Sequence, residues 1–334
     1  MRSYKKTIIG AIILLLFVLS SCLYSFYGPK DFNEQIFIKD NHAKIIGRAP
    51  FPPSKEHWLG TDRNGRDMHL LLIFGAKFTL ITSFGVALLR VLIGGFLGLF
   101  FSLWAPGLKK YFNDFFLAFR YVPSVLLGII LMIPVAAVFN GVNVYSIITY
   151  QFLILVFIGV PSVTIFAADI ANELKKMTFI QSSYLMGANH FHILRKQLMP
   201  YLRSYGLLFF VQQILSTLQV MMHLGIFGLY LGGPTQMQIF GYDDPPKNAS
   251  FSNEWAGLIG QNFNEFRMAP WTVFAPVICF FIVILIVNMM KKEIEENIAG
   301  IQGVKMKVMK KKESPLPHDL KTARAFEFVE RVES

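Results

Sequence analysis

Four polar side chains recur at helical spacing within an apolar run in the second half of the chain. They are Gln212, Ser216, Gln219 and His223, and Tyr205 and Tyr230 continue the same line. Steps of four, three and four residues place such a stripe on one face of a helix. Amides, a hydroxyl and an imidazole can bind a polar solute, but they would be unpaired against lipid. Two interpretations follow: the stripe lines a pathway for a solute such as a peptide, or it bonds to a neighbouring helix.

An arginine stands near the middle of another apolar run. Arg90 would cost at least ~2.5 kcal/mol at the centre of a helix that faced lipid, so it must meet a partner. One interpretation assigns it to the pathway, where it meets a carboxylate of the solute or of a partner protein. The other is pairing within a helix bundle. The sequence offers no obvious acidic residue at matching depth.

Residue patterns typical of catalysis do not occur in the sequence. It has no His-Glu-x-x-His, no Gly-x-Ser-x-Gly and no phosphate-binding Gly-x-x-x-x-Gly-Lys pattern. The two cysteines, Cys22 and Cys279, stand in apolar runs, which argues against a disulfide framework or a cysteine metal site. We therefore predict no catalytic residue, no metal site and no cofactor, and we do not expect an enzyme.

The composition is that of a polytopic membrane protein. Hydrophobic residues make up 54% of the chain and charged residues 16%. The net charge of +11 does not indicate a nucleic-acid partner. Lysine and arginine concentrate at the ends of apolar runs and in the C-terminal tail, where anionic lipid and the positive-inside rule favour them.

Six apolar runs are predicted to span the membrane. They cover residues 7–26, 78–104, 122–139, 145–171, 205–231 and 270–290. Glycines in the second run permit close helix packing, and prolines in the third and fourth predict kinks. The link between the second and third runs carries Lys109, Lys110 and Arg120, so we interpret it as an inner loop.

The first run has two interpretations. It is either a retained transmembrane helix, or part of a lipoprotein leader in which Leu-Ser-Ser-Cys at residues 19–22 is the cleavage box and Cys22 carries lipid. After it, residues 28–74 are polar and are predicted to lie outside. Within them, Thr61 or Asp62 would cap a short amphipathic helix that runs through Met68 and Leu72 along the outer surface.

A basic interruption separates the fourth and fifth runs. Its cations are Lys175, Lys176, Arg195, Lys196 and Arg203, which predict a cytoplasmic location. Residues 183–192 are expected to form a short helix that Gly187 breaks and Pro200 closes. A short helix held between two spans can transmit force between a membrane protein and a soluble partner.

The spacing of this interruption resembles the cytoplasmic coupling loop of bacterial ABC importer permeases. That loop carries Glu-Ala-Ala followed by a glycine and a proline at fixed distances. Here Gln-Ser-Ser replaces Glu-Ala-Ala, and the distances to Gly187 and Pro200 are kept. The resemblance assigns the coupling loop to Gln181, Ser182, Ser183, Gly187, Ala188, His190 and Pro200.

A second match is more specific. Residues 57–67, His-Trp-Leu-Gly-Thr-Asp-Arg-Asn-Gly-Arg-Asp, precede Gly-Ala-Lys-Phe-Thr-Leu at 75–80. This resembles the start of the permease core in the dipeptide, oligopeptide and nickel subfamily, in the second of its two permease subunits. Glu254-Trp255 and Ala269-Pro-Trp271 add a third match. The outer motif is thus His57, Gly60, Thr61, Asp62, Gly65, Arg66 and Asp67.

The resemblance implies an all-α fold, that of a type I ABC importer permease with about six spans. Residues 1–75 would form the first span and an outer segment, residues 76–290 the permease core with its coupling loop at 173–202, and residues 291–334 a cytoplasmic tail. Both termini would lie in the cytoplasm of a bacterium, with the core in the inner membrane and in contact with its lipid.

The resemblance also implies partners. These are a homologous permease as the other half of a heterodimer, two ATP-binding subunits that hydrolyse ATP, and an extracytoplasmic solute-binding protein. Uptake of peptides, nickel chelates or related small solutes would proceed by alternating access. The alternative is a non-transporting membrane protein, a lipidated sensor or a docking subunit, which the Gln-Ser-Ser variant and the atypical tail favour.

Overall fold

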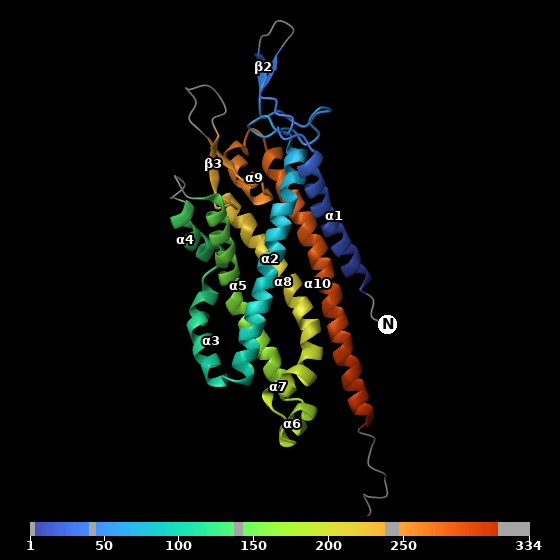
Figure 1. Cartoon of the computed structure of the whole chain (residues 1–334). Coiled ribbons are helices and arrows are strands. Elements are labelled where there is room, and N and C mark those ends of the chain that lie inside the picture. The colour runs from blue at the N-terminus through green and yellow to red at the C-terminus, as the bar shows by residue number, and fades with distance from the viewer. Residues whose placement is uncertain (1–3, 40–44, 137–142, 238–246, 313–334) are drawn as a thin grey trace, which may run out of the picture.

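The computed structural model describes residues 4–39, 45–136, 143–237 and 247–312, and most of this part is helical (Figure 1). Within it, five helical segments are long and apolar enough to cross a membrane. They are α1 (Lys5–Tyr27), α2 (Met68–Leu103), α5 (Val144–Lys175), the segment His190–Ile226 that ends in α8 (Met199–Ile226), and the Trp271–Ala299 part of α10 (Trp271–Lys312). The prediction of an all-α polytopic membrane protein is confirmed.

The third predicted span is divided. α3 (Pro106–Tyr121) and α4 (Ser124–Ala136) meet at Pro123 and lie beside α5 at the edge of the bundle (Figure 1). The segment predicted as a loop after the second span is instead helix α3, which is amphipathic and has a charged face with the composition of a loop. Its location on the inner side stays a prediction. The end of the predicted span, residues 137–139, lies outside the described residues.

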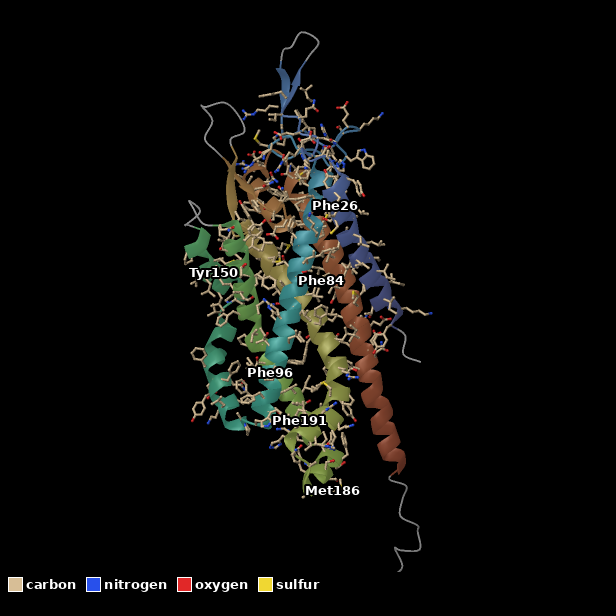
Figure 2. All side chains as sticks on the ribbon, viewed as in Figure 1. Phe26, Phe84, Phe96, Tyr150, Met186 and Phe191 are labelled. Carbon is tan, nitrogen blue, oxygen red and sulfur yellow. The ribbon has the colours of Figure 1, made fainter. Side chains whose placement is uncertain are left out.

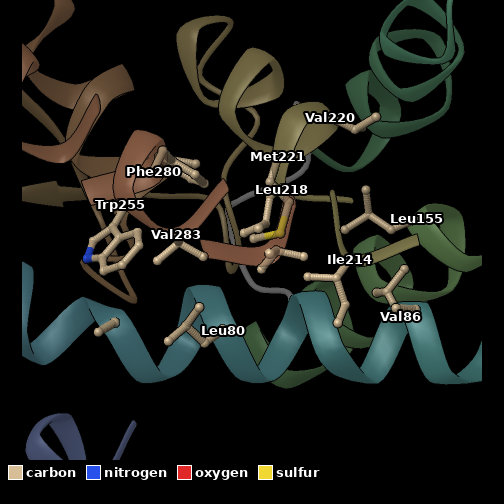
Figure 3. Close-up of a cluster of buried hydrophobic side chains, with 14 of the residues drawn as sticks. Leu80, Val86, Leu155, Ile214, Leu218, Val220, Met221, Trp255, Phe280 and Val283 are labelled. Atoms are coloured by element: carbon tan, nitrogen blue, oxygen red, sulfur yellow. The ribbon is translucent and has the colours of Figure 1, made fainter. Parts of the chain in front are cut away.

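The centre of the bundle is the packing of α2 against α5 and α8. Leu80 and Val86 of α2 meet Leu155 of α5 and Leu218 of α8 in one buried apolar cluster (Figure 3). Gly98 permits the close approach of α2 to α5, because a Cβ there would lie 2.5 Å from the carbonyl oxygen of Thr164. The glycines predicted to allow close helix packing include this position.

Helix α1 lies at the edge and is attached at both of its ends. At its start, the Glu293 carboxylate of α10 accepts hydrogen bonds from the backbone N–H groups of Lys6 and Thr7 at 3.1 and 2.7 Å. These donors have no partner within α1, so α10 supplies the cap of another helix. Near its other end, Ser21 Oγ donates to the carbonyl of Phe74 in α2 at 2.8 Å. Cys22 lies inside this continuous helix.

Large apolar side chains cover much of the outside of these helices. Phe26 on α1 and Phe96 on α2 point away from the bundle (Figure 2) and are 84% and 70% exposed. Such a surface is stable only against lipid or another apolar protein surface.

The two ends of the bundle are built differently (Figure 1). The first, called the motif end, carries β1 (Phe37–Lys39), β2 (Ile45–Arg48), β3 (Pro234–Met237), β4 (Lys247–Ser250), α9 (Trp255–Asn262) and the short helix η2 (Phe263–Glu265). The strands form two antiparallel pairs, β1 with β2 and β3 with β4. The second, called the loop end, carries α6 (Thr178–Leu185), α7 (His190–His192) and the π-helical turn η1 (Ile193–Leu198).

The separate amphipathic helix predicted at the motif end does not exist. α2 begins at Met68 and continues without a break to Leu103, and Met68 and Leu72 are buried. Asp67 occupies the N-cap position, although its side chain does not cap the helix. The spacing of Met68 and Leu72 is that of apolar residues in the first buried turns of α2. An amphipathic surface helix has the same spacing, so the sequence pattern did not distinguish the two.

Candidate functional site

The loop end turns sharply at Gly187. This residue has a φ of +84°. The N–H of Gly187 bonds to the carbonyl of Tyr184, and the N–H of Ala188 to that of Ser183, both at 3.0 Å. These two bonds form a Schellman motif, which ends α6 and favours glycine at the left-handed position. The predicted break at Gly187 is confirmed.

Pro200 does not close a helix, so that prediction was wrong. The chain is helical from His190 through η1 into α8, and Pro200 lies in the first turn of α8. A proline interrupts a helix because it lacks an N–H and crowds the preceding turn, but the first turn tolerates it. The π-helical hydrogen bonding of η1 just before it shifts the bonding register there. The loop end is therefore joined to α8 by continuous helix.

A small apolar cluster fixes the loop end to the bundle. Ile180, Ile193 and Leu198 are fully buried against Leu103 of α2 and Leu174 of α5. Ser183 Oγ donates to the carbonyl of Phe179 at 3.0 Å and accepts from the Gln197 amide. The arrangement is a rigid hairpin seated on the ends of two spans.

The tip of this hairpin is exposed and partly apolar. Leu185, Met186 and Phe191 are 89%, 80% and 61% exposed, and Met186 stands at the extreme end of the bundle (Figure 2). An open hollow of about 430 Å³ lies beside Gly187. The coupling-loop residues predicted from the sequence do not include these apolar ones. Apolar residues between two spans are hard to distinguish from the spans by hydropathy.

Other predicted coupling residues occupy varied positions. Gln181 and Ser182 are exposed, and Ser182 Oγ bonds back to the carbonyl of Thr178 at 2.9 Å. His190 is exposed, and its Nδ1 lies 3.3 Å from the Tyr184 hydroxyl. The structure thus brings the predicted loop residues together in one hairpin.

The polar stripe lies on α8. Gln219 and His223 are exposed, whereas Gln212 and Ser216 are partly exposed. Tyr230 does not continue this line, contrary to the prediction: α8 ends at Ile226, and Tyr230 is 3% exposed in the following turn. The chain leaves the helix at Gly228, whose φ of +75° lies in the left-handed region that favours glycine after the last turn of a helix.

Arg90 is enclosed by the bundle. Its Nε donates to the carbonyl of Leu155 at 2.9 Å, and its Nη1 donates to Oε1 of Gln213 at 3.1 Å. A Cβ at Gly159 would lie 2.2 Å from Nε, so this glycine leaves the room for the guanidinium. Gln213 directly follows Gln212 of the stripe. It was not predicted as a partner of Arg90, because only acidic residues were considered as partners for this cation.

The outer motif is a buried hydrogen-bonded network. Asp62 Oδ2 accepts two bonds from the Arg66 guanidinium, at 2.8 and 3.0 Å, and its Oδ1 accepts the backbone N–H groups of Asn64 and Arg66, both at 2.9 Å. Arg66 Nη1 also donates to Oδ1 of Asn253, the residue just before the Glu254-Trp255 match, at 3.3 Å. The motif therefore links the outer segment to the chain around α9.

The remaining motif residues complete this network. His57 Nδ1 lies 2.5 Å from Oδ1 of Asp67, and Thr61 Oγ1 accepts from the N–H of Phe51 at 2.8 Å. Gly60 and Gly65 have φ of +72° and +79°. The arrangement satisfies most of its polar atoms internally, which is typical of a structural motif; His57 Nε2 is buried without a hydrogen-bond partner among the described residues.

Helix α9 inserts between the spans at the motif end. Trp255 Nε1 donates to the carbonyl of Leu72 at 2.9 Å, and Glu254 Oε1 accepts from the N–H of Leu231 at 2.6 Å. Glu254 is 1% exposed. Burial raises the pKa of Glu254 to about 7, and the bond from Leu231 opposes this.

Metal binding has no support in the described part of the chain, where no group of three or more His, Cys, Asp or Glu side chains is placed to hold an ion. The fold and its two ends define a multi-pass membrane protein with an exposed hairpin at one end and a buried polar network at the other.

Comparison with known proteins narrows this class. No family model matches the chain. The dipeptide transport system permease protein DppC of Alkalihalophilus pseudofirmus is 25% identical over 300 residues, which cover 86% of this chain and 84% of that protein. The glutathione transport system permease protein GsiD of Pectobacterium atrosepticum is 25% identical over 244 residues, 71% of this chain and 70% of that protein.

A third relative is the oligopeptide transport system permease protein AmiD of Streptococcus pneumoniae. It is 25% identical over 230 residues, which cover 68% of this chain and 69% of that protein. The resemblance to ABC permease subunits of the peptide-transport group is therefore confirmed.

Proposed function

We propose that this chain is the transmembrane permease subunit of an ABC importer for peptides or related small solutes. The observation that carries the proposal is the loop-end hairpin, which is fixed to α2 and α5 by a buried cluster yet exposes Leu185 and Met186 at its tip. A rigid lever with an apolar tip is suited to seat in a groove on a soluble subunit.

The route of force follows from the helix connections. Because the helix runs from His190 through η1 into α8, a push on the hairpin displaces α8 and, through the buried cluster, α5. Two ATP-binding subunits on separate chains would hydrolyse ATP, and their closure would shift the permease between inward-open and outward-open states.

The proposed orientation places the loop end in the cytoplasm. Lys175, Lys176, Arg195 and Lys196 gather there, and the C-terminal part of α10 is rich in lysine up to Lys312. Both termini are then cytoplasmic, and the motif end meets a solute-binding protein outside the inner membrane.

The stripe on α8 is our candidate for this subunit's side of the pathway. Gln219 and His223 are exposed in this chain, so a homologous permease on that face would enclose them between two subunits. Arg90 of α2 bonds to Leu155 of α5 and to Gln213 of α8. These bonds support a role for Arg90 in holding the three helices in place. Gln219→Leu should lower uptake while the complex still assembles; normal uptake by this variant would assign the pathway to another surface.

The hairpin is tested with two matched methionines. Met186 at the loop end is 80% exposed and Met268 at the motif end is 83% exposed. Met186→Glu should abolish co-purification of the ATP-binding subunits and ATP-dependent uptake, because a charge replaces an apolar contact. Met268→Glu should leave the binding of the ATPase unchanged. Membrane abundance is measured for both.

Equal ATPase binding by the two variants, with uptake retained, would contradict the coupling role of the hairpin. A wild-type chain that binds an ATPase but transports no solute would favour a docking subunit instead.

A further inference from the structure

A buried carboxyl group at the motif end has one oxygen without a hydrogen-bond partner. Glu254 stands just before α9 and is 1% exposed. Its Oε1 accepts from the N–H of Leu231, but its Oε2 has no partner among the described residues. An ionised carboxylate only accepts hydrogen bonds, whereas a protonated one also has an O–H to donate. Because an unpaired buried charge costs more than an unpaired neutral group, this oxygen is better suited to carry a proton.

The space beside Glu254 cannot hydrate a charge. A small cavity of about 10 Å³ adjoins it, with room for about one water molecule. The Gln151 amide also lines this cavity, but it already bonds at both ends, to the carbonyl of Tyr230 at 3.0 Å and to the N–H of Gly232 at 2.9 Å. The other side chains of the lining are apolar: Met132, Leu155, Met221, Leu224, Leu229 and Leu231.

The outer motif brings charge close to Glu254 but does not neutralise it. Arg66 donates to Oδ1 of Asn253, the residue before Glu254, at 3.3 Å. Its guanidinium also forms two bonds to Asp62, so this cation is already matched by an anion. Burial raises the pKa of Glu254 to about 7, and the bond from the N–H of Leu231, rather than a cation, opposes this.

The remaining titratable groups at this end lie on the turn after α8, on the outer motif and on η2. Tyr230 precedes Leu231, and burial raises its pKa to about 12, so the phenol is neutral near pH 7. Arg63 and Glu265 line a separate cavity with Tyr230. The other elements present neutral side chains to the segment 254–257: Thr79 of α2, Met132 of α4, Gln151 of α5, Met221 of α8, Phe280 of α10 and Ser250 of β4.

A proton on Oε2 of Glu254 would have an acceptor close by. Ser250 is 4% exposed, and its Oγ also has no hydrogen-bond partner among the described residues. A Cβ at Gly257 would lie 2.2 Å from this Oγ and 3.5 Å from Cγ of Glu254, so the two side chains lie on the same side of α9. A water molecule between them can join the acid O–H to the Ser250 hydroxyl.

Glu254 and Gln151 together hold the turn after α8. Glu254 accepts the N–H of Leu231 at 2.6 Å, and Gln151 bonds to the residues on either side of Leu231. The turn is thus bound to the start of α9 by one side chain and to α5 by the other. A displacement of the turn from α9 would break the bond to Glu254 and expose its carboxyl group to water.

We propose that Glu254 is a proton-binding site that links the opening of the motif end to pH. While the turn is bound to α9, the carboxyl group is neutral. When the turn moves away, water reaches the group and it releases its proton. The closed turn is therefore favoured at low pH and loses this advantage as the pH rises. The proposal concerns the turn itself and does not depend on the import of a solute.

The range of pH follows from the two states of the carboxyl group. In water Glu254 has the ordinary pKa of 4.5, and in the closed turn its pKa is about 7. Below the lower value both states hold the proton, and above the higher value both have lost it, so opening does not depend on pH there. Between the two values only the closed state holds the proton, so each unit of pH should favour opening by up to about tenfold.

Hydrogen exchange of the turn, measured by mass spectrometry on the purified full-length protein in lipid nanodiscs, tests this linkage. Glu254→Gln keeps an oxygen to accept from Leu231 but cannot ionise. At each pH the exchange rate of the wild-type turn is divided by that of the variant, which cancels the pH dependence of amide exchange itself. The ratio should rise with pH between 4.5 and about 7 and then level off. A ratio that stays constant with pH would overturn the proposal.

Glu56→Gln is the control, because Glu56 is an exposed carboxylate at the same end of the molecule. The turn of this variant should exchange as the wild-type turn does at every pH. If Glu56→Gln abolished the pH dependence, the titrating group would not be Glu254, and the proposal would fail.

Infrared spectroscopy of the wild-type protein is a second measurement that needs no folded variant. A neutral carboxyl group has a carbonyl band that a carboxylate lacks, and exposed carboxyl groups are ionised at about pH 6. This band should be present at about pH 6 and disappear by about pH 9. Its absence at the lower pH would mean that Glu254 is charged in the closed turn, which contradicts the proposal.

Discussion

The outer motif and the loop-end hairpin both carry the sequence resemblance, yet they treat their polar residues in opposite ways. Asp62, Arg66 and Asp67 are at most 5% exposed. Asp62 bonds to Arg66 and to backbone, and Asp67 bonds to the side chains of His57 and Asn33. Gln181 and Ser182 of the hairpin are exposed. The polar residues of the outer motif thus support the fold from inside, whereas those of the hairpin are accessible to another protein.

The physical reason lies in what a substitution disturbs. A buried charge pair tolerates no loss of one partner, because the remaining charge stays desolvated. An exposed residue on a rigid hairpin can change with little effect on folding. The comparison predicts large stability effects at the motif and small ones at the loop.

The largest effect should follow Arg66→Met. The substitution leaves Asp62 buried without its cation, which should destabilise the protein by about 3–5 kcal/mol. The thermal midpoint of the purified protein measures this, with Lys55→Met, an exposed lysine in the same segment, as the control. Equal midpoints for the two variants would contradict the supporting role of the pair.

A matched pair of glycines gives the next largest effect. Both Gly65 and Gly187 have positive φ, at +79° and +84°. A Cβ at Gly65 would lie 2.3 Å from the carbonyl oxygen of Gln35, whereas none of the protein's other atoms lies within 4 Å at Gly187 in the described structure.

Gly65→Ala should therefore cost more than ~2 kcal/mol, from backbone strain and a clash together. Gly187→Ala should cost about 1 kcal/mol, from backbone strain alone. Chemical denaturation measures the free energy of unfolding of both variants. A larger loss of stability for Gly187→Ala than for Gly65→Ala would mean that the space beside Gly187 is not empty.

The smallest effect should follow Gln181→Glu, which restores the acidic residue of the resembled loop. Its side chain is exposed, so the stability should change by less than ~0.5 kcal/mol. The ATPase-binding affinity is measured on the same protein. A large loss of stability in Gln181→Glu would show that the Gln181 side chain contributes to folding.

Sequence patterns located most of the fold because bilayer thickness imposes a length on each span. The Gly187 turn was also predictable, since a helix that ends in the left-handed region favours glycine there. Pro200 was misjudged because the π-helical turn η1 before it shifts the hydrogen-bonding register, so the helix continues past the proline. α3 was missed because its Lys109 and Lys110 face resembles a loop.

The candidate sites were less predictable, because they depend on distances between remote segments. Arg90 meets Gln213, and these residues lie 123 positions apart. A cavity at the motif end is lined by both Arg63 of the outer motif and Gln261 of α9. Neither pairing has a local sequence pattern, and both partners of Arg90 are uncharged.

The Glu293 cap on α1 has a consequence for the order of synthesis. Lys6 and Glu293 lie 287 positions apart, so the ribosome makes the first helix long before the residue that completes its start. During that interval the N–H groups at the start of α1 have only water or lipid head groups as partners. The first and last spans can join only when translation is nearly complete. The contact between α1 and α10 therefore forms late in synthesis, and a chain cut short before Glu293 leaves the start of α1 without this cap.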